Sequence, residues 1–456
     1  MVATPRAPYD ETTAPDWDAF VDRWWQRRVV VFRAASPIVL GDAFTSALAA
    51  GRRQLADTYD AGARRAAQFS IDGQQQAFVA PWLPIAADRD FAGYADRLAG
   101  PLAGRRHALM ISRFHAHDIA LWSALRAHFA PLWQRIGLPL TGAITTLFHG
   151  DYEATPTGVH KDRFATMMFA LAGRKRMRFW PARPWREPVS TITRYDAYLA
   201  TSFAVEVGPG DVLYWPSSYY HVGESVGGIA TSANIGIPID EHRPAYDIDD
   251  LVSGANHDLD LPEAERRRGR LATGRSSALV RGALSATGEL APRLPPALRC
   301  ALDDLQRVTA PAETAARQHA LWLARRSAGG FEPPPPPGPR RRLHDGDRVH
   351  GDRAFPVLLA AARGPAAPGE HTRGWLCAAS GRTLPVIPHP AVPALFAALG
   401  SGRPLRVGDL LLPFGARTAA IRRLLEQLVA LHALGRLAGR ATAATRRRSR
   451  SSPSSR

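Results

Sequence analysis

Two histidines and one aspartate have the residue types and the spacing of a metal site. His160 and Asp162 are two residues apart, and side chains at this spacing on a β-strand point to the same face of the sheet. They could therefore hold one metal ion from a single strand. His221 follows a Gly-Asp turn, an apolar run and a proline, so it could supply a third ligand from a distant strand. Two imidazoles and one carboxylate suit non-haem iron(II) and leave three coordination positions for a 2-oxo acid and dioxygen.

A lysine could bind the far end of such an acid. Lys175 is one of only two lysines in a chain with 56 arginines. We expect a tight turn at Gly173 to separate a strand at residues 166–171 from one at 176–180, which would return Lys175 to the mouth of a barrel. A buried lysine needs an anionic partner. The C5 carboxylate of 2-oxoglutarate, chelated at the metal through its other end, would provide one.

Three further polar side chains could bind this cosubstrate. The hydroxyl groups of Thr157 and Thr166 could donate hydrogen bonds to its C5 carboxylate. Asn234 lies on the last expected strand and could reach it too. With Lys175, these residues form the expected cosubstrate-binding set.

Short apolar or alternating runs, separated by turn signals, surround the candidate ligands. The expected strands span residues 144–148, 166–171, 176–180, 203–207 and 212–215. Many short strands at this spacing favour a double-stranded barrel or jelly roll. Before them, helical spacing of apolar residues predicts helices at 17–27, with Asp16 as N-cap, and at 119–136, with a short strand at 29–32. The sequence therefore predicts an α+β fold.

The segment that carries these residues resembles the JmjC-type, cupin-fold oxygenases that depend on Fe(II) and 2-oxoglutarate. It is similar to the asparaginyl hydroxylase of hypoxia-inducible factor and to the bacterial ribosomal oxygenases. The resemblance rests on a His-x-Asp pair, on Lys175 fifteen residues after His160, on Thr157 three residues before His160, and on Tyr219-Tyr220-His221 after Pro216. It covers residues 141–240 clearly and residues 15–35 more weakly.

The resemblance implies a double-stranded β-helix core and a function. The function is hydroxylation of an amino-acid side chain in a protein or peptide, with Fe(II) held by His160, Asp162 and His221, and with 2-oxoglutarate and O2 as cosubstrates. The same three ligands would be the catalytic residues. Bacterial ribosomal oxygenases usually carry arginine where this chain has Lys175, which leaves the identity of the protein substrate open.

Composition shifts predict six parts along the chain. They are N-terminal α/β elements that flank the barrel (1–140), the catalytic core (141–245), a helical region that could form a homodimer (250–328), a proline-rich linker (329–342), a winged-helix-like domain (343–438) and a disordered Arg/Ser tail (439–456). The helices expected in the winged-helix-like domain span 392–399, 407–411 and 418–434.

Composition also limits the classes of protein. The net charge of +17 suggests polyanionic partners. However, the excess of arginine over lysine indicates a general compositional drift, so nucleic acid is not favoured as a partner. The two cysteines, Cys300 and Cys377, are too few for a disulfide framework. The chain has no apolar run of the ~20 residues that span a bilayer and no secretory leader in residues 1–18, so we expect a cytoplasmic protein without a membrane partner.

Two other histidine pairs share the spacing of metal ligands. His149 and Asp151 form a second His-x-Asp pair, but Gly150 weakens a strand there and no cation lies at the corresponding spacing. His115 and His117 form a His-x-His pair, which we expect on the surface of a loop before a helix.

Two other functions stay open at this point. The chain could be a cupin-type sensor of a metal or small acid, coupled to a winged helix that reads nucleic acid. It could also be an oxygenase that acts on a small molecule, in which case the mouth of the site should be closed and narrow.

Overall fold

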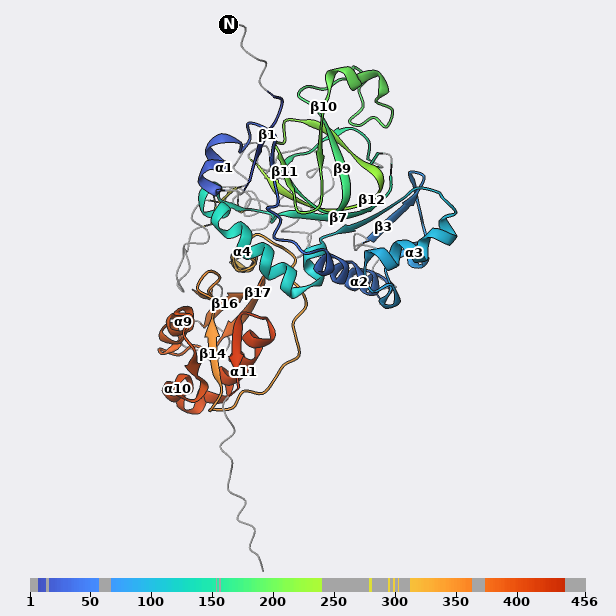
Figure 1. Cartoon of the computed structure of the whole chain (residues 1–456). Helices are drawn as coiled ribbons and strands as arrows, with labels where there is room; N and C mark the ends of the chain where they lie inside the picture. Colours follow the sequence, from blue (N-terminus) through green and yellow to red (C-terminus); the bar gives the residue numbers. More distant parts are fainter. Residues whose placement is uncertain are drawn as a thin grey trace, which may run out of the picture.

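A large sheet and a smaller C-terminal unit make up the described part of the computed structural model (Figure 1). The structure describes residues 7–13, 16–56, 67–152, 154–155, 157–239, 279–280, 294–295, 298–299, 302, 312–362 and 374–438. The fold is mixed α+β, as the sequence predicts. We call residues 7–239 the sheet region and residues 340–438 the C-terminal region.

The sheet region is built on one eleven-stranded sheet. Its order is β1-β2-β11-β9-β12-β7-β5-β3-β4, while β10 pairs with β9 and β8 pairs with β12. The strands are β1 (Asp10–Thr12), β2 (Val30–Phe32), β3 (Ala67–Ile71), β4 (Gln74–Gln75), β5 (His107–Ser112), β7 (Ile144–Gly150), β8 (His160–Lys161), β9 (Phe164–Trp180), β10 (Phe203–Val207), β11 (Val212–Trp215) and β12 (Tyr220–Pro238). The expected strands at 144–148, 203–207 and 212–215 are thereby confirmed.

The strand β9 runs without interruption through Gly173, so the expected division into two strands is wrong. Its first half pairs with β11 and its second half with β10, while β12 pairs with both halves across a bulge between Val226 and Thr231. Gly173 has a φ of +65°, and a Cβ there would lie 2.1 Å from the carbonyl oxygen of Ile229. The glycine therefore permits a bend in a continuous strand and does not make a hairpin turn.

The bend turns the two halves of β9 toward a common core. Met168 and Ala170 from the first half pack in one apolar cluster with Met177 and Phe179 from the second half. Other members come from the strands that flank each half: Val205 and Val207 of β10, Leu213 and Trp215 of β11, and Val29 and Val31 at β2. The alternate side chains of the first half, such as Phe169, face a second core under the helices.

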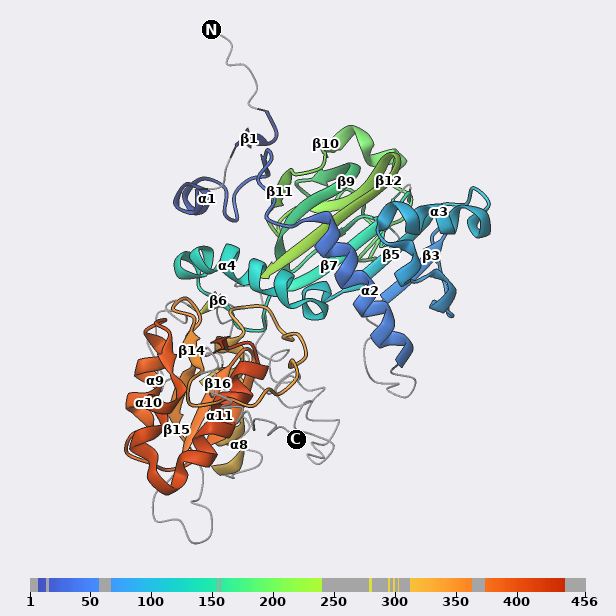
Figure 2. The ribbon, with the colours of Figure 1, turned by 60° about the horizontal axis from the view of Figure 1, so that its bottom comes forward.

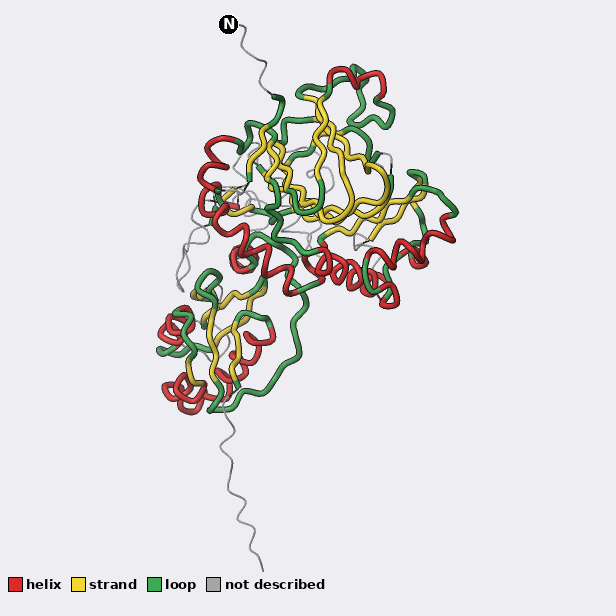
Figure 3. Tube along the Cα trace, in the orientation of Figure 1, coloured by secondary structure: helices red, strands yellow, loops and turns green. Residues whose placement is uncertain are grey.

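Helices cover the outer side of the sheet, as Figure 3 shows in red. They are α1 (Trp17–Arg23), α2 (Leu40–Ala56), α3 (Phe91–Leu102) and α4 (Ile119–Ile136). The helix predicted at 119–136 is confirmed, and it begins after Asp118, whose carboxylate accepts a hydrogen bond from the amide of Leu121 at 2.7 Å. The first helix starts at its predicted N-cap, Asp16, but ends at Arg23 and not at residue 27.

The C-terminal region has its own apolar core and two small sheets. Its elements are β14 (Arg348–Gly351), β15 (Leu358–Ala361), β16 (Trp375–Ala379), β17 (Arg382–Val386), α9 (Val392–Gly400), β18 (Leu405–Arg406), α10 (Val407–Leu411), α11 (Thr418–Ala430) and β19 (Leu434–Leu437). All three helices expected there are present, but α11 ends at Ala430 because the chain turns at His432, which has a positive φ, and continues as β19.

A stacked arginine joins the two regions. The guanidinium of Arg126 on α4 lies between the rings of Trp122 and Phe355, with its carbon 4.0 and 3.8 Å from the two ring centroids. It also donates a hydrogen bond to the carbonyl of Ser327 at 3.2 Å. Burial lowers the pKa of Arg126 to about 9. The indole of Trp122 donates a hydrogen bond to the carbonyl of Phe331. The segment that leads into the C-terminal region is therefore held against α4.

Most of the helical region expected at 250–328 lies outside the described residues, as do Cys300 and the tail at 439–456. The described helix α8 (Ala312–Ser327) packs against β16 and β17 (Figure 2). The homodimer therefore stays a prediction. Within the part of the chain that the structure describes, no helix is long and apolar enough to cross a membrane.

Candidate metal centre and adjoining cavity

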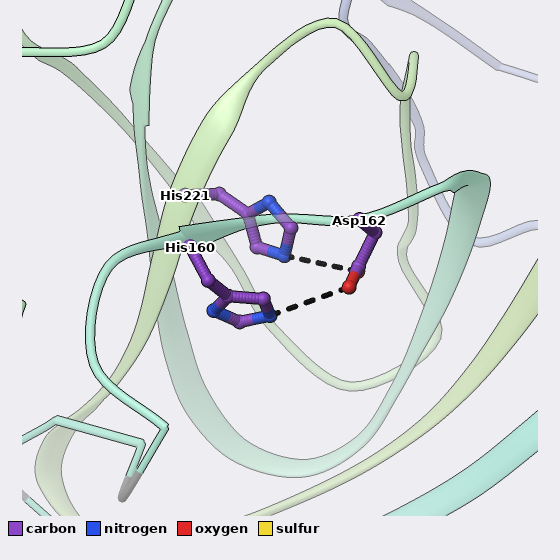
Figure 4. Close-up of side chains that lie close together, drawn as sticks. All are labelled: His160, Asp162 and His221. Carbon is purple, nitrogen blue, oxygen red and sulfur yellow. Dashed lines mark ion pairs between the residues drawn. The ribbon is translucent and has the colours of Figure 1, made fainter. Parts of the chain in front are cut away.

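His160, Asp162 and His221 come together at the end of the paired strands β8 and β12 (Figure 4). His160 and His221 lie directly opposite each other in this pairing, and Asp162 follows β8 immediately. The Asp162 carboxylate lies between the two rings, 3.5 Å from His160 Nε2 and 3.4 Å from His221 Nε2. The three ligand atoms lie within 4.8 Å of one another. They thus face one point in space, as metal ligands must.

Backbone contacts set the orientation of the His160 ring. Its Nδ1 lies 2.9 Å from the carbonyl oxygen of Gly158, which can only accept a hydrogen bond, so Nδ1 carries the proton and Nε2 faces Asp162. Gly158 has a φ of +72°, and a Cβ there would lie 2.3 Å from the carbonyl oxygen of Ile192. The neighbouring amide of Val159 donates to the same carbonyl at 2.7 Å. The loop between β9 and β10 therefore supports the segment that carries His160 and Asp162.

Electrostatics keeps the aspartate ionised. Burial raises the pKa of the Asp162 carboxyl, but hydrogen bonds and charge from His160 and His221 outweigh it and hold the pKa well below its usual range. Burial lowers the pKa of His160, and Asp162 together with the Gly158 carbonyl outweighs this effect, so the pKa is raised. A proton and a metal ion therefore compete for Nε2 of His160.

The donor set fits a divalent transition metal. Two imidazole nitrogens and one carboxylate suit non-haem iron(II), and the ring orientation set by Gly158 is the support that metal-ligating histidines usually have. Among the described residues, this is the one group of three or more histidine, cysteine or acidic side chains that could hold a metal ion.

A cavity of about 140 Å³ adjoins the triad. It lies between the two halves of the sheet, because its lining comes from β7, from both halves of β9 and from both halves of β12. Besides the triad, the lining residues are Ile144, Thr146, Phe148, Thr155, Thr157, Phe164, Thr166, Lys175, Met177, Gly223, Asn234 and Gly236. All four of the cosubstrate-binding residues expected from the sequence therefore face the same cavity as the metal ligands.

Lys175 is a buried cation without an anion. Its side chain is 3% exposed, and its Nζ donates hydrogen bonds to the hydroxyl groups of Tyr152 and Ser232, the latter at 2.9 Å. The ring of Phe148 lies 4.8 Å from Nζ. No carboxylate pairs with it in the described part of the chain. Burial consequently lowers the pKa of Lys175 to about 7.

Three buried oxygens in this cavity have no hydrogen-bond partner among the described residues. They are Oγ1 of Thr155, Oγ1 of Thr166 and Oδ1 of Asn234. Buried polar atoms are rarely left in this state, because each one costs free energy. Together with Lys175 they form a polar cradle, in which the two hydroxyl groups and Nζ could donate hydrogen bonds to a small anion, while Oδ1 of Asn234 needs a hydrogen-bond donor.

Sequence reasoning missed three residues of this cradle. Tyr152 and Ser232 hold Lys175, and Thr155 lies beside it, since a Cβ at Gly223 would meet Lys175 Cε at 3.2 Å and Thr155 Cγ2 at 3.4 Å. No motif marked these residues, although Thr155 is only two positions before Thr157. The side chain of Thr157 is exposed at the edge of the cavity.

The other histidine pairs lie elsewhere. His149 is buried, with Nδ1 2.8 Å from Oγ1 of Thr231, and its ring stacks on Phe91, so it packs in the core. The expectation that His115 lies on a loop surface is wrong: the residue is 0% exposed, and its Nδ1 lies 2.5 Å from Oγ1 of Thr145. Burial lowers the pKa of both histidines to about 3, which keeps them neutral.

Comparison with known proteins gives structural neighbours only. No family model matches the chain, and no curated protein matches it. An X-ray structure of YcfD from Escherichia coli covers 93% of this chain and 98% of its own length, at 15% identity and a TM-score of 0.44. A structure described as YcfD, a ribosomal oxygenase from Escherichia coli, gives 16% identity and a TM-score of 0.43 over the same shares. A complex of YcfD with cobalt and 2-oxoglutarate gives 15% and 0.41, over 93% and 99% of the two chains. At this similarity, what the neighbours bind says nothing of this chain.

Proposed function

We propose that this protein is an Fe(II)- and 2-oxoglutarate-dependent oxygenase of the JmjC type, which hydroxylates a side chain of a protein or peptide. One observation carries the proposal: a single cavity holds a His-Asp-His ligand set and a buried lysine that has no anionic partner among the described residues. A metal alone would explain the ligand set, and a small acid alone would explain the lysine. A 2-oxo dicarboxylate bound to the metal explains both.

The chain's own residues bind and orient the reactants. His160, Asp162 and His221 would hold iron(II), which with 2-oxoglutarate and dioxygen supplies the oxidising power for hydroxylation, with succinate and carbon dioxide as co-products. Lys175 would pair with the C5 carboxylate, while Tyr152 and Ser232 hold its Nζ in place.

The unpartnered atoms complete the cosubstrate site. Thr155 and Thr166 can donate to the same carboxylate from their hydroxyl groups. The Asn234 side chain offers an amide to the acid and an oxygen to a water or a donor. Thr157 stands at the exposed edge, where it would contact the cosubstrate or the substrate.

The architecture proposed for this enzyme is a double-stranded β-helix followed by a winged-helix-like domain. The two halves of β9, which share one core, would belong to the two sheets of the β-helix, each paired with one half of β12. The order α9, β18, α10, α11, β19 and its pairing through β14 support the winged helix.

A polypeptide substrate is supported by the surface beside the cavity. The cavity is open at its rim, where Ile144 is 47% exposed and Thr157 is also exposed. A groove of about 1000 Å³ lies on the other face of β9 and β12, since its lining residues Arg176 and Glu224 alternate with Lys175 and Gly223 of the cavity, so the groove does not lead to the metal ligands. A site for small molecules would be closed at the rim.

The test is release of succinate from 2-oxoglutarate by the purified protein with iron(II) under air, compared with His160→Ala and Lys175→Ala. We expect slow release by the wild type and none by either variant. Iron-dependent binding of 2-oxoglutarate is measured in parallel, since turnover without substrate is slow. If the protein neither releases succinate nor binds 2-oxoglutarate in an iron-dependent way, the proposal is wrong.

A further inference from the structure

Positive charge is segregated along this chain. Residues 1–339 contain 38 basic and 35 acidic residues, whereas residues 340–438 contain 14 arginines and six acidic residues. The tail at 439–456 adds six arginines and no acid. A compositional drift toward arginine would act on the whole chain equally. The excess of basic over acidic residues is therefore a property of the C-terminal part. The whole-chain composition, which indicates only a general drift toward arginine, does not reveal it.

Five arginines of the C-terminal region lie on adjoining elements, and we call them the arginine surface: Arg342, Arg348, Arg406, Arg422 and Arg423. Arg348 on β14 lies directly opposite Arg406 on β18, and both are exposed. Like charges opposite each other on neighbouring strands destabilise a sheet, so this pair has no structural benefit in the free protein.

The chain segment before β14 brings α11 to the same surface. Arg422 on α11 donates a hydrogen bond to the carbonyl of Leu343 at 2.9 Å and pairs with the carboxylate of Asp345. Arg406 donates to the carbonyl of Asp345 at 3.2 Å. The hydrogen bond and charge of Arg422, and then the charge of Arg406, lower the pKa of Asp345. Arg406 and Arg422 are thereby anchored around one exposed carboxylate.

The remaining three arginines have no carboxylate partner in the described part of the chain. Arg342 precedes Leu343, Arg348 is exposed on β14, and Arg423 follows Arg422 on the exposed side of α11. The nearest further acid on α11, Glu426, accepts a hydrogen bond from the amide of Leu343. The surface thus presents two anchored guanidinium groups and three without a carboxylate partner among the described residues, while Asp345 and Glu426 are already engaged.

We propose that the arginine surface binds the phosphate backbone of a nucleic acid. Planar guanidinium groups match phosphate oxygens in pairs, and no lysine takes part. The groups are spread over a strand pair, an extended segment and a helix, which suits an extended polyanion and not a single small anion. This inference does not depend on the oxygenase activity and goes beyond it.

The test measures binding of the full-length protein to a fluorescently labelled DNA duplex and to the RNA duplex of the same sequence over a range of salt concentrations. The variant is Arg342→Gln/Arg348→Gln/Arg423→Gln, which removes three exposed side chains that pair with no described carboxylate and should fold normally. The matched control is Arg105→Gln/Arg106→Gln/Arg194→Gln, which removes three exposed arginines that line the groove of the sheet region. Melting temperatures of both variants check folding.

We expect the salt dependence, the slope of log K against log salt concentration, to fall by about two to three units in the first variant, since each phosphate contact contributes about 0.9. The control should keep the wild-type slope. A preference between the two duplexes would identify the nucleic acid.

Four results would overturn the inference. The first is absence of binding to either duplex, and the second is an equal fall of the salt-dependence slope in both variants. The third is loss of duplex binding only when residues 439–456 are removed. The fourth is competition for the duplex site by polyglutamate as strong as that by unlabelled nucleic acid. The last would indicate an acidic protein partner. None of these results affects succinate release. A failure of the nucleic-acid proposal can therefore be distinguished from a failure of the oxygenase proposal.

Discussion

The cavity of the sheet region and the arginine surface of the C-terminal region hold their cations in opposite ways. Lys175 is buried beside two hydroxyl groups, with no carboxylate partner in the ranges that the structure describes, whereas Arg348 and Arg423 are exposed to solvent. A buried cation costs free energy until an anion arrives, so a single residue indicates a ligand. An exposed arginine costs little, so only the number and placement of several arginines carry information. Substitutions should accordingly have large effects in the cavity and small ones on the surface.

The largest effect is expected at the metal ligands. Asp162→Ala removes the carboxylate between the two imidazoles and should weaken binding of cobalt(II), used as an air-stable probe, by more than about 100-fold, which is the upper range for residues that only orient a ligand. Calorimetric titration measures it. Asp151→Ala, in the other His-x-Asp pair, should bind as the wild type does. Equal affinities of Asp162→Ala and the wild type would place the metal elsewhere.

The next effect concerns the bend that creates the cavity. Gly173→Ala puts a methyl group against the carbonyl of Ile229 at a positive φ, and should lower the free energy of unfolding by about 2–4 kcal/mol. Chemical denaturation measures the change. Gly208→Ala meets no atom within 4 Å and serves as the control. Similar stabilities of the two variants would show that the two halves of β9 do not depend on this glycine.

Loss of the buried cation ranks third. Lys175→Met should weaken binding of 2-oxoglutarate to the metal-loaded protein by roughly 10- to 100-fold, the range for a hydrogen bond to a charged group. The only other lysine, Lys161, is exposed on β8, and Lys161→Met should leave the affinity unchanged. If both lysine variants bind equally well, the cradle around Lys175 does not hold the cosubstrate.

The same lysine predicts a pH dependence. Burial lowers the pKa of Lys175 to about 7, and a bound carboxylate raises it again. Above about pH 7 the empty site loses its proton, so binding must take one up, and the affinity should fall by up to about tenfold per pH unit. Below about pH 7, Lys175 is charged in both the free and the bound protein, so it makes the affinity for 2-oxoglutarate independent of pH. Titrations in buffers with different ionisation enthalpies count the proton, and Lys175→Arg, which stays charged, should remove the dependence.

The smallest effect belongs to the surface. Arg348→Gln relieves the pairing with Arg406 and should change the free energy of unfolding by only a few tenths of a kcal/mol, in the stabilising direction. At low salt, the melting temperature of the variant should equal that of the wild type or lie slightly above it. At high salt, the two melting temperatures should be the same. A clear destabilisation would mean that Arg348 has a structural partner, and the contrast with the cavity would weaken.

The metal ligands were predictable because their chemistry is local in the sequence and their spacing matches one strand. His160 and Asp162 needed only the two-residue period of a strand, and the structure places His221 opposite His160. The helix at 119–136 was equally clear from its apolar spacing and its cap at Asp118.

Long-range contacts were not predictable. Tyr152 and Ser232 are 23 and 57 residues from Lys175, and common residue types at such separations give no sequence signal. Gly173 was interpreted as a turn because glycine permits both a turn and a bend, and only the pairing of β12 with both halves of β9 distinguishes them. His115 was misplaced because a polar residue before a helix usually lies at the surface, whereas tertiary packing buries this one.

The stacked Arg126 has a consequence for how the two regions would work together. A desolvated cation held between the rings of Trp122 and Phe355 makes a stiff joint, unlike a flexible linker. A stiff joint sets a constant span between the arginine surface and the metal ligands. A ligand long enough to reach both would gain effective concentration at the second site, whereas one shorter than the span would gain nothing.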